Sequence, residues 1–229
     1  MLKILSWNIR QGGGTRTNTI SKALQKENAE IVVLSEYRNN DSGIRLRLNL
    51  LRMGYRFVNV SAAKSNDNAV AIFSKLPCNH FLYAQADEDY PHNVVCSEFD
   101  AFDVFGVYLP HKKKHKLFDF LLEEMPKGKP SILVGDYNTG KNHIDQKGNS
   151  FWYTDKIVAL EKLGYVDAFR HIHNDIKEYS WYSHQGNGYR YDHTYVHESL
   201  LPIVKDCYYL HSWREDGLSD HSPMVLVLG

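Results

Sequence analysis

The sequence has few cysteines and no pairing pattern among them. Cys78, Cys96 and Cys207 are odd in number and far apart along the chain. This is typical of buried free thiols in a reducing compartment. No Cys-x-x-Cys pair occurs, which argues against a structural zinc ribbon.

Long hydrophobic runs are also missing. No apolar stretch approaches the roughly 20 residues that a membrane-spanning helix needs. The first apolar run already ends at Asn8, which is too early for the apolar core of about 7–15 residues that a signal peptide needs. For a complete chain we therefore expect a cytoplasmic protein with no membrane partner.

Neither charge is in excess, because 27 basic residues balance 27 acidic ones. A protein that coats DNA non-specifically is normally basic overall, but this balance says little for or against nucleic acid, because an enzyme that binds phosphates only near its site needs just a local basic patch. His111–Lys116 forms one basic patch, and a solvated loop explains it equally well. A second basic stretch includes Arg45 and Arg47, which we interpret as a solvated helix face.

Apolar patterning predicts alternating strands and helices in 229 residues, with no linker rich in Pro, Gly or Ser. We therefore expect a single domain over residues 1–229, with a layered α/β architecture of two packed sheets. Strands are expected at Leu2–Ile9, Ile31–Glu36, Arg56–Val60, Ala69–Ser74, Val94–Phe99, Asp103–Leu109, Ser131–Val134, Tyr189–Val196, Cys207–Leu210 and Met224–Leu228. Helices are expected at Thr17–Glu27, Ile44–Met53, Lys116–Glu124 and Thr154–Leu163.

Short polar clusters lie where several of these strands end. Carboxylates and amides gathered at strand ends are the raw material of a metal-assisted hydrolytic site. The first cluster contains residue 8 and the last residue 221, so both ends of the chain must build the same site. The clusters are Trp7-Asn8, Ser35-Glu36, Gly135-Asp136-Tyr137-Asn138, Arg190-Tyr191-Asp192 and Ser219-Asp220-His221.

The cluster at Gly135–Asn138 is the most specific of the five. If the chain stays extended there, Asp136 and Asn138 face the same way, so that one is placed to act as a base toward water and the other to bind a phosphate oxygen. A plain turn is equally compatible with these residues. Taken alone, Glu36 is more typical of an exposed strand end, and the Asp220-His221 pair of a structural contact.

The order of the motifs resembles that of the endonuclease/exonuclease/phosphatase superfamily, and within it the exonuclease III-type abasic-site endonucleases. The resemblance spans essentially the whole chain. The matching pieces are Ser6–Ile9, Leu34–Glu36, Asn68–Ile72, Val107–Pro110, Gly135–Asn138, Gly164–Arg170, Tyr179–Trp181, Arg190–Asp192 and Ser219–Pro223.

The resemblance implies a four-layered α/β sandwich of two facing mixed β-sheets flanked by helices. It implies Glu36 as the main metal ligand, with Asn8 and Asp220 nearby, and the oxygen ligands suit Mg²⁺ or Mn²⁺. It implies that Asp136 orients or deprotonates the attacking water, that Asn138 and Tyr108 contact the phosphate, and that His221 stabilises its charge while Asp192 orients His221. We expect substrate binding by Arg10, His111, Lys112, Trp181, Tyr189 and Arg190.

Three positions depart from the pattern of the abasic-site enzymes. Arg10 stands where many of them carry a small acidic or amide residue, which adds positive charge. His111 replaces an Asn and brings a pH-dependent charge. Tyr189 replaces a Trp, so a pocket for an extruded sugar, which Trp181 and Tyr189 would frame, is shaped differently.

We therefore expect a divalent-metal-dependent phosphodiesterase that cuts DNA, as an abasic-site endonuclease, a 3′–5′ exonuclease or both. No obligate protein partner is evident. The alternative is an enzyme of the same superfamily that acts on a small phosphate ester, a nucleotide or a lipid head group. A third hypothesis, a catalytically silent nucleic-acid binder, predicts that a key group is missing, yet Glu36, Asp136, Asn138, Asp192 and His221 are all present.

Overall fold

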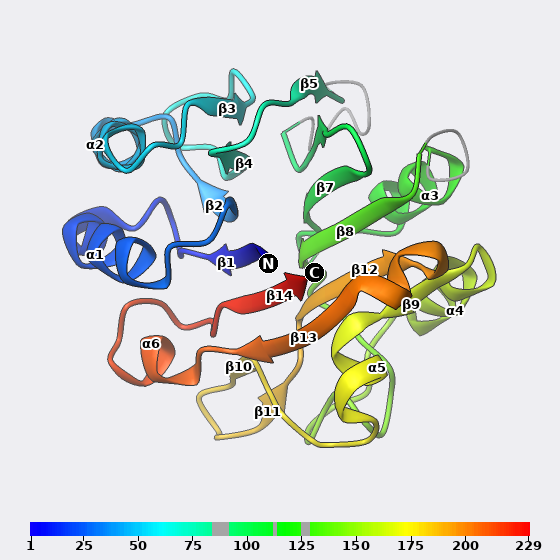
Figure 1. The fold of residues 1–229 in the computed structure, drawn as a ribbon. Helices are drawn as coiled ribbons and strands as arrows, with labels where there is room; N and C mark the ends of the chain where they lie inside the picture. Colours follow the sequence, from blue (N-terminus) through cyan, green and yellow to red (C-terminus); the bar gives the residue numbers. More distant parts are fainter. Residues whose placement is uncertain (84–91, 112–113, 125–128) are drawn as a thin grey trace.

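Two six-stranded mixed sheets face each other, with helices on both outer sides (Figure 1). The computed structural model describes residues 1–83, 92–111, 114–124 and 129–229, so the expected substrate residue Lys112 lies outside the described residues. The first sheet has the order β13-β14-β1-β2-β4-β3. Its strands are β1 (Leu2–Asn8), β2 (Ile31–Tyr37), β3 (Phe57–Val60), β4 (Ala69–Ser74), β13 (Val204–Tyr209) and β14 (Met224–Leu228).

The second sheet has the order β5-β6-β7-β8-β12-β9. Its strands are β5 (Asn79–Leu82), β6 (Val94–Glu98), β7 (Asp103–Tyr108), β8 (Ser131–Asp136), β9 (Tyr165–Asp167) and β12 (Asp192–His197). A separate short hairpin pairs β10 (Trp181–Tyr182) with β11 (Gly188–Tyr189).

The helices form the outer layers. On the first sheet lie α1 (Thr17–Glu27), α2 (Asp41–Arg52) and α6 (His211–Glu215), and on the second α3 (Lys114–Glu124) and α4 (Thr154–Lys162) (Figure 1). The helix α5 (Ala168–His173) places Phe169 in the core between the sheets. The part of the chain that the structure describes also contains two short 3₁₀ helices, Gly14–Arg16 and Glu198–Ile203. The predicted four-layered α/β sandwich is therefore confirmed.

Alternation along the strands builds three apolar layers. In β2, Ile31 and Val33 enter the core between the sheets, whereas Val32 and Leu34 pack under the outer helices. In β8, Val134 faces the inner core and Leu133 the outer one. Because both faces are covered, these strands are continuous apolar runs in the sequence rather than alternating ones.

The strand register brings the polar clusters together. β1 and β2 are parallel, with Asn8 opposite Ser35, and β7 and β8 are parallel, with Tyr108 opposite Asp136. β12 runs antiparallel to β8, which sets Asp192 opposite Asp136. At Gly135 a Cβ atom would lie 1.8 Å from the carbonyl oxygen of Val107, so only glycine permits this close approach.

Several expectations about elements were wrong in detail. The expected strand Tyr189–Val196 is divided, because Arg190 and Tyr191 leave the ladder between β11 and β12. The helix expected at Ile44–Met53 begins earlier, at Asp41, since the Asn40 side chain accepts a hydrogen bond from the Gly43 N–H and caps it. The short elements β5, β9, β10, α5 and α6 were not expected.

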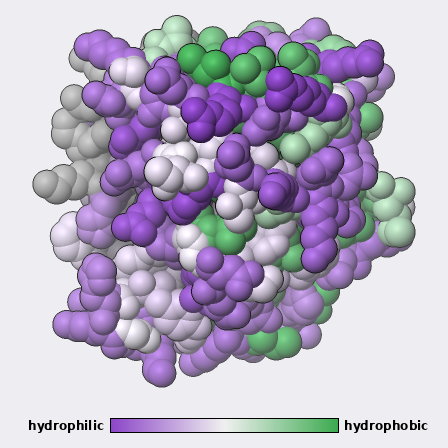
Figure 2. Space-filling model, turned by 90° about the vertical axis from the view of Figure 1, so that its left-hand side faces the viewer, coloured by the Kyte–Doolittle hydropathy of each residue, from purple (hydrophilic) through white to green (hydrophobic). Residues whose placement is uncertain are grey.

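The face that carries α1, α2 and α6 is mainly hydrophilic, with hydrophobic side chains gathered toward its upper edge (Figure 2). On α2, Ile44, Leu48 and Leu51 are about half exposed, at 53%, 49% and 50%. Arg45 and Arg47 of the same helix are exposed, as the solvated-face interpretation predicted. Among the described residues, no helix combines the length and the apolarity needed to cross a membrane.

Candidate active site

The Asn8 side chain connects the two sheets at the site. Its Nδ2 donates to Glu36 Oε1 at 3.2 Å and to Asp136 Oδ2 at 2.9 Å. Its Oδ1 accepts the Arg10 N–H at 2.9 Å, which fixes the amide with its nitrogen toward both carboxylates. Asn8 therefore positions the carboxylates of β2 and β8 relative to each other.

Glu36 sits in a backbone conformation that is rare for a residue with a side chain. Its φ is +54°, at an irregularity in the pairing of β2 with β4, and such strain is characteristic of functional positions. Its Oε1 also accepts the Tyr108 hydroxyl at 3.2 Å, and its Oε2 accepts the Gln11 N–H at 2.8 Å. Burial and the Glu36 charge raise the pKa of Tyr108, so the phenol keeps its proton and donates.

His221 lies between two buried carboxylates. Its Nδ1 is 2.8 Å from Asp192 Oδ2, and its Nε2 is 4.0 Å from Asp136 Oδ2. Burial alone would lower the pKa of His221, but Asp192 and Asp136 outweigh it and raise that pKa to about 10. The imidazole is therefore cationic at neutral pH.

Asp136 is buried at the end of β8, and its carboxylate is held from several sides. Its Oδ1 accepts the Asn138 N–H at 2.9 Å, and its Oδ2 accepts Asn138 Nδ2 at 3.2 Å. Burial raises the pKa of Asp136 to about 7, against the opposing effect of the His221 charge. Of the two alternatives for this segment, the structure has the turn, because the Asn138 backbone is left-handed with φ +49° and its side chain donates back to Asp136.

Asp136, Asp192 and His221 offer ligand atoms that all lie within 4.8 Å of one another. Three such groups are a possible metal site, but the imidazole faces a carboxylate with each nitrogen and holds its proton. A protonated imidazole does not bind a cation. This group is better suited to proton transfer and charge stabilisation.

Glu36 and Asp220 fit a hard divalent cation better. Glu36 is partly exposed, and within the described part of the chain its Oε2 accepts one hydrogen bond, from the Gln11 N–H, so an acceptor position is left for a cation. Asp220 is 40% exposed, with Arg10 Nε at 3.9 Å and the Trp181 indole donating to its Oδ2 at 3.4 Å. Carboxylates that water can reach match the preference of Mg²⁺ for oxygen ligands and retained waters.

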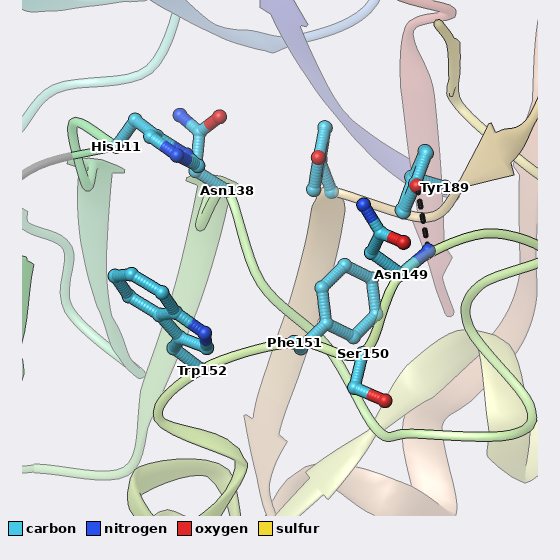
Figure 3. Close-up of a pocket in the computed structure, with 8 residues that line it drawn as sticks. His111, Asn138, Asn149, Ser150, Phe151, Trp152 and Tyr189 are labelled. Atoms are coloured by element: carbon cyan, nitrogen blue, oxygen red, sulfur yellow. Dashed lines mark hydrogen bonds between the residues drawn. The ribbon is translucent and has the colours of Figure 1, made fainter. Parts of the chain in front are cut away.

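An aromatic cluster adjoins the site. The rings of Tyr189 and Tyr191 stack with centroids 5.4 Å apart, and Trp181 lies 5.5 Å from Tyr191 and 6.0 Å from Tyr189. These three rings pack on one another, and a sugar pocket framed by Trp181 and Tyr189 stays a prediction. A pocket next to them is lined by His111, Asn138, Asn149, Ser150, Phe151, Trp152, Tyr189 and Tyr191 (Figure 3).

The expected contact between Arg190 and substrate was wrong. Arg190 is fully buried, with its Nε 2.7 Å from Asp145 Oδ1 and its Nη2 2.5 Å from Asp167 Oδ2. The guanidinium is thus already paired with two carboxylates. Arg190 anchors the segment before Asp192 and has no surface to offer a ligand.

Several residues of the site were missed in the sequence. The Ser180 hydroxyl accepts the N–H groups of Tyr191 and Asp192, and the Ser219 hydroxyl donates to the Asn8 carbonyl at 2.6 Å. Both serines lie inside motifs named in the sequence analysis, Tyr179–Trp181 and Ser219–Pro223, so these motifs could have pointed to them. Phe151 and Trp152 lie on a loop that no strand-end pattern marks.

Known proteins are similar to this chain over nearly its whole length. A model of the endonuclease/exonuclease/phosphatase family matches residues 5–221. An exodeoxyribonuclease of Bacillus subtilis is 27% identical over 259 residues, covering 99% of each chain. A DNA-(apurinic or apyrimidinic site) endonuclease of Dictyostelium discoideum is 26% identical, covering 99% of this chain and 70% of that protein.

Solved structures show the same fold. An AP endonuclease from Archaeoglobus fulgidus superposes with a TM-score of 0.85 at 22% identity, covering 100% of this chain and 99% of that one. The 3′ phosphatase NExo from Neisseria, bound to a product DNA hairpin, superposes with a TM-score of 0.84 at 23% identity, covering 100% of both chains.

Proposed function

The chain belongs to the endonuclease/exonuclease/phosphatase family, and from this premise we propose that it is a divalent-metal-dependent phosphodiesterase that hydrolyses DNA. The observation that carries the proposal is a chain of side-chain contacts across the site. Asn8 bonds both Glu36 and Asp136, and His221 lies between Asp136 and Asp192. These groups suit water attack on a phosphodiester.

DNA is the substrate that the similarities favour. The relatives that match nearly the whole of this chain are named exodeoxyribonuclease and DNA-(apurinic or apyrimidinic site) endonuclease, and one similar structure holds a DNA hairpin. The activities proposed are cleavage at abasic sites, removal of 3′-terminal nucleotides, or both, with a role in DNA repair. A single catalytic domain over residues 1–229 and a place in the cytoplasm stay predictions from the sequence.

A divalent cation, Mg²⁺ or Mn²⁺, would be held by Glu36 with Asp220 and would neutralise negative charge on the phosphate oxygens. Asn8 would hold the Glu36 carboxylate through its amide nitrogen, which revises the direct ligand role expected for Asn8. Tyr108 donates to the same carboxylate and so limits its rotation.

Asp136 is the proposed base. Its pKa of about 7 lies close to neutral pH, where a base combines useful ionisation with affinity for a proton. It would take a proton from the attacking water, while the cationic His221 stabilises charge that develops on the phosphate. Asp192 keeps the imidazole protonated and oriented through its 2.8 Å contact.

Arg10, His111 and Asn138 are proposed to contact substrate phosphates or sugars around this centre. Arg10 is exposed beside Asp220, and His111 and Asn138 line the adjacent pocket. Lys112, outside the described residues, is proposed to add positive charge next to His111.

Cleavage assays with defined DNA test the proposal. The protein is incubated with Mg²⁺ and an abasic-site duplex, a 3′-recessed duplex and a single strand, with Asp136→Asn as the inactive control. We expect metal-dependent cleavage that Asp136→Asn abolishes. No cleavage of any DNA, together with hydrolysis of a nucleotide or another small phosphate ester, would select the alternative substrate class.

A further inference from the structure

We propose that the pocket beside Asn138 binds a nucleobase, so that the nucleotide next to the cleaved phosphate keeps its base and stacks it on Trp152. This inference rests on the proposed function and narrows its substrate class to unpaired, base-bearing ends of DNA. The pocket has a volume of about 260 Å³ and no acidic or basic side chain other than His111 in its lining.

The pocket opens directly next to the proposed catalytic groups. Asn138 lines it and donates to Asp136 Oδ2 at 3.2 Å. Only the Asn138 side chain therefore separates a ligand in the pocket from the Asp136 carboxylate, which would activate water. A nucleotide whose phosphate is bound at Asp136 and His221 has its sugar and base within reach of this space.

Aromatic side chains are four of the eight residues that line the pocket. The stacked pair Tyr189 and Tyr191 forms one part, and the Phe151 ring packs 5.8 Å from both. In Figure 3, Phe151, Asn149 and Tyr189 lie on one side of the opening, and Trp152 and His111 on the other. Tyr189 is itself held in place, because its hydroxyl accepts the Asn149 N–H at 3.0 Å.

Trp152 is an exposed ring on a held backbone. It is 73% exposed, which is more than for any other tryptophan, tyrosine or phenylalanine among the described residues. The Thr139 hydroxyl donates to its carbonyl at 2.6 Å, and the neighbouring Phe151 N–H donates to Asn142 Oδ1 at 2.7 Å. A fixed, uncovered aromatic face is the platform on which proteins stack unpaired bases.

The polar lining supports a base rather than a bare sugar. Asn149, Ser150 and His111 add polar groups to the pocket lining, the kind of groups that meet the edges of unpaired bases. An abasic deoxyribose lacks the flat apolar ring that would cover Trp152 and Phe151. A base paired in a duplex cannot enter without leaving its partner, so single-stranded or frayed 3′ ends are the favoured substrates.

Binding of two small ligands tests this without relying on catalysis. Calorimetry with Mg²⁺ compares 5′-dAMP, the type of product that a 3′–5′ exonuclease releases, with deoxyribose 5-phosphate, which has the same phosphate and no base. We expect 5′-dAMP to bind at least about fivefold more tightly. Trp152→Ala should remove this difference and Trp152→Phe should keep most of it.

Phe81→Ala is the matched control, because Phe81 is 47% exposed on the edge strand β5, outside the pocket lining. It should leave the preference for 5′-dAMP unchanged. Equal affinity for the two ligands, no measurable binding of 5′-dAMP, or a preference that survives Trp152→Ala would each overturn the base pocket.

The DNA assays separate the two proposals. If wild type and Trp152→Ala cut base-bearing and abasic 3′ ends with the same relative rates, the base pocket is wrong and the nuclease function stands. If 5′-dAMP is preferred through Trp152 but no DNA is cut, the base pocket stands and the DNA substrate is wrong.

Discussion

His221 combines three features that a charge-stabilising group needs. It is buried, it is 2.8 Å from one carboxylate and 4.0 Å from another, and its pKa is raised to about 10. A cation in a site that excludes water acts more strongly on a developing phosphate charge than one in solvent. The charge of His221 depends on Asp192. Among the described residues, the Asp192 carboxylate has no hydrogen-bond partner other than His221.

Replacing Asp192 by Asn should therefore reduce catalysis. The imidazole would lose the contact that favours its protonated form and fixes its orientation, and we expect kcat to fall by about 10²–10³-fold. Steady-state kinetics on a DNA substrate measures this. Asp206→Asn, at a carboxylate 48% exposed on β13, is the control, and equal losses in the two variants would show that Asp192 has no specific role.

Glu36 is expected to govern the metal requirement. Glu36→Gln keeps the shape of the side chain but removes its charge, so the affinity for Mg²⁺ should drop and excess cation should partly restore activity. A titration of activity against Mg²⁺ gives the half-saturating concentration, which should rise at least about tenfold. An unchanged midpoint would place the cation elsewhere.

Beneath the site, the ends of several elements are tied by buried ion pairs. Arg190, in the segment between β11 and β12, bonds Asp145 of the loop after β8 and Asp167 at the end of β9. Arg170 of α5 joins the same Asp145 at 2.5 Å. These contacts hold the loops that carry the pocket, because each partner lies on a different element.

Removing this arginine should be costly. In Arg190→Ala, two carboxylates lose a partner while they remain buried, and breaking such a pair costs about 3–5 kcal/mol. Urea unfolding at neutral pH measures the difference, and Arg214→Ala, at a partly exposed arginine of α6, is the control. A loss below about 1 kcal/mol would mean that water reaches the cluster.

The same cluster predicts acid sensitivity. Burial opposes ionisation, yet Arg190 holds the pKa of Asp145 and of Asp167 below the ordinary value. Carboxyls with depressed pKa values stabilise the fold above their unfolded pKa, near 3.9, and lose this contribution as pH falls below it. Unfolding free energy should thus decline below about pH 4, and Arg190→Ala should show a shallower decline.

The two ends of the chain meet within one sheet. β1 pairs with β14 along five residue pairs, from Leu2 with Leu228 to Ser6 with Met224. At the site, the Trp7 indole donates to the His221 carbonyl at 3.0 Å. The position of His221, the proposed charge-stabilising residue, therefore depends on a residue 214 positions earlier, and segments near residues 7 and 221 are both needed to form the site.

Trp7→Phe tests this link. The substitution keeps an aromatic ring in the core but removes the donor, so we expect about 1 kcal/mol less stability and a fall in kcat as the His221 backbone relaxes. Trp213→Phe alters the edge-packed neighbour of Trp7, 4.9 Å away, without touching His221. Equal kcat values in the two variants would contradict the proposed link.

Much of the architecture could be predicted from local patterns. The bounds of α1, β4 and β14 agree with the expected ones, since an amphipathic period or a continuous apolar run marks such elements directly. Short elements such as β9 and α6 could not be predicted, because three to five residues are too few to show a hydrophobic period. The polar clusters were found for the same reason as the strands that they follow.

The sequence by itself determined the strands, the polar residues at their ends and, through the order of its motifs, the family. The tertiary structure alone decided that Arg190 is buried between two carboxylates, that Asn138 turns back toward Asp136, and that the open pocket lies against Trp152. The physical reason is range. Backbone propensity and hydrophobic period act over a few neighbouring residues, whereas burial, ion pairing and pocket shape depend on contacts between residues far apart in the chain.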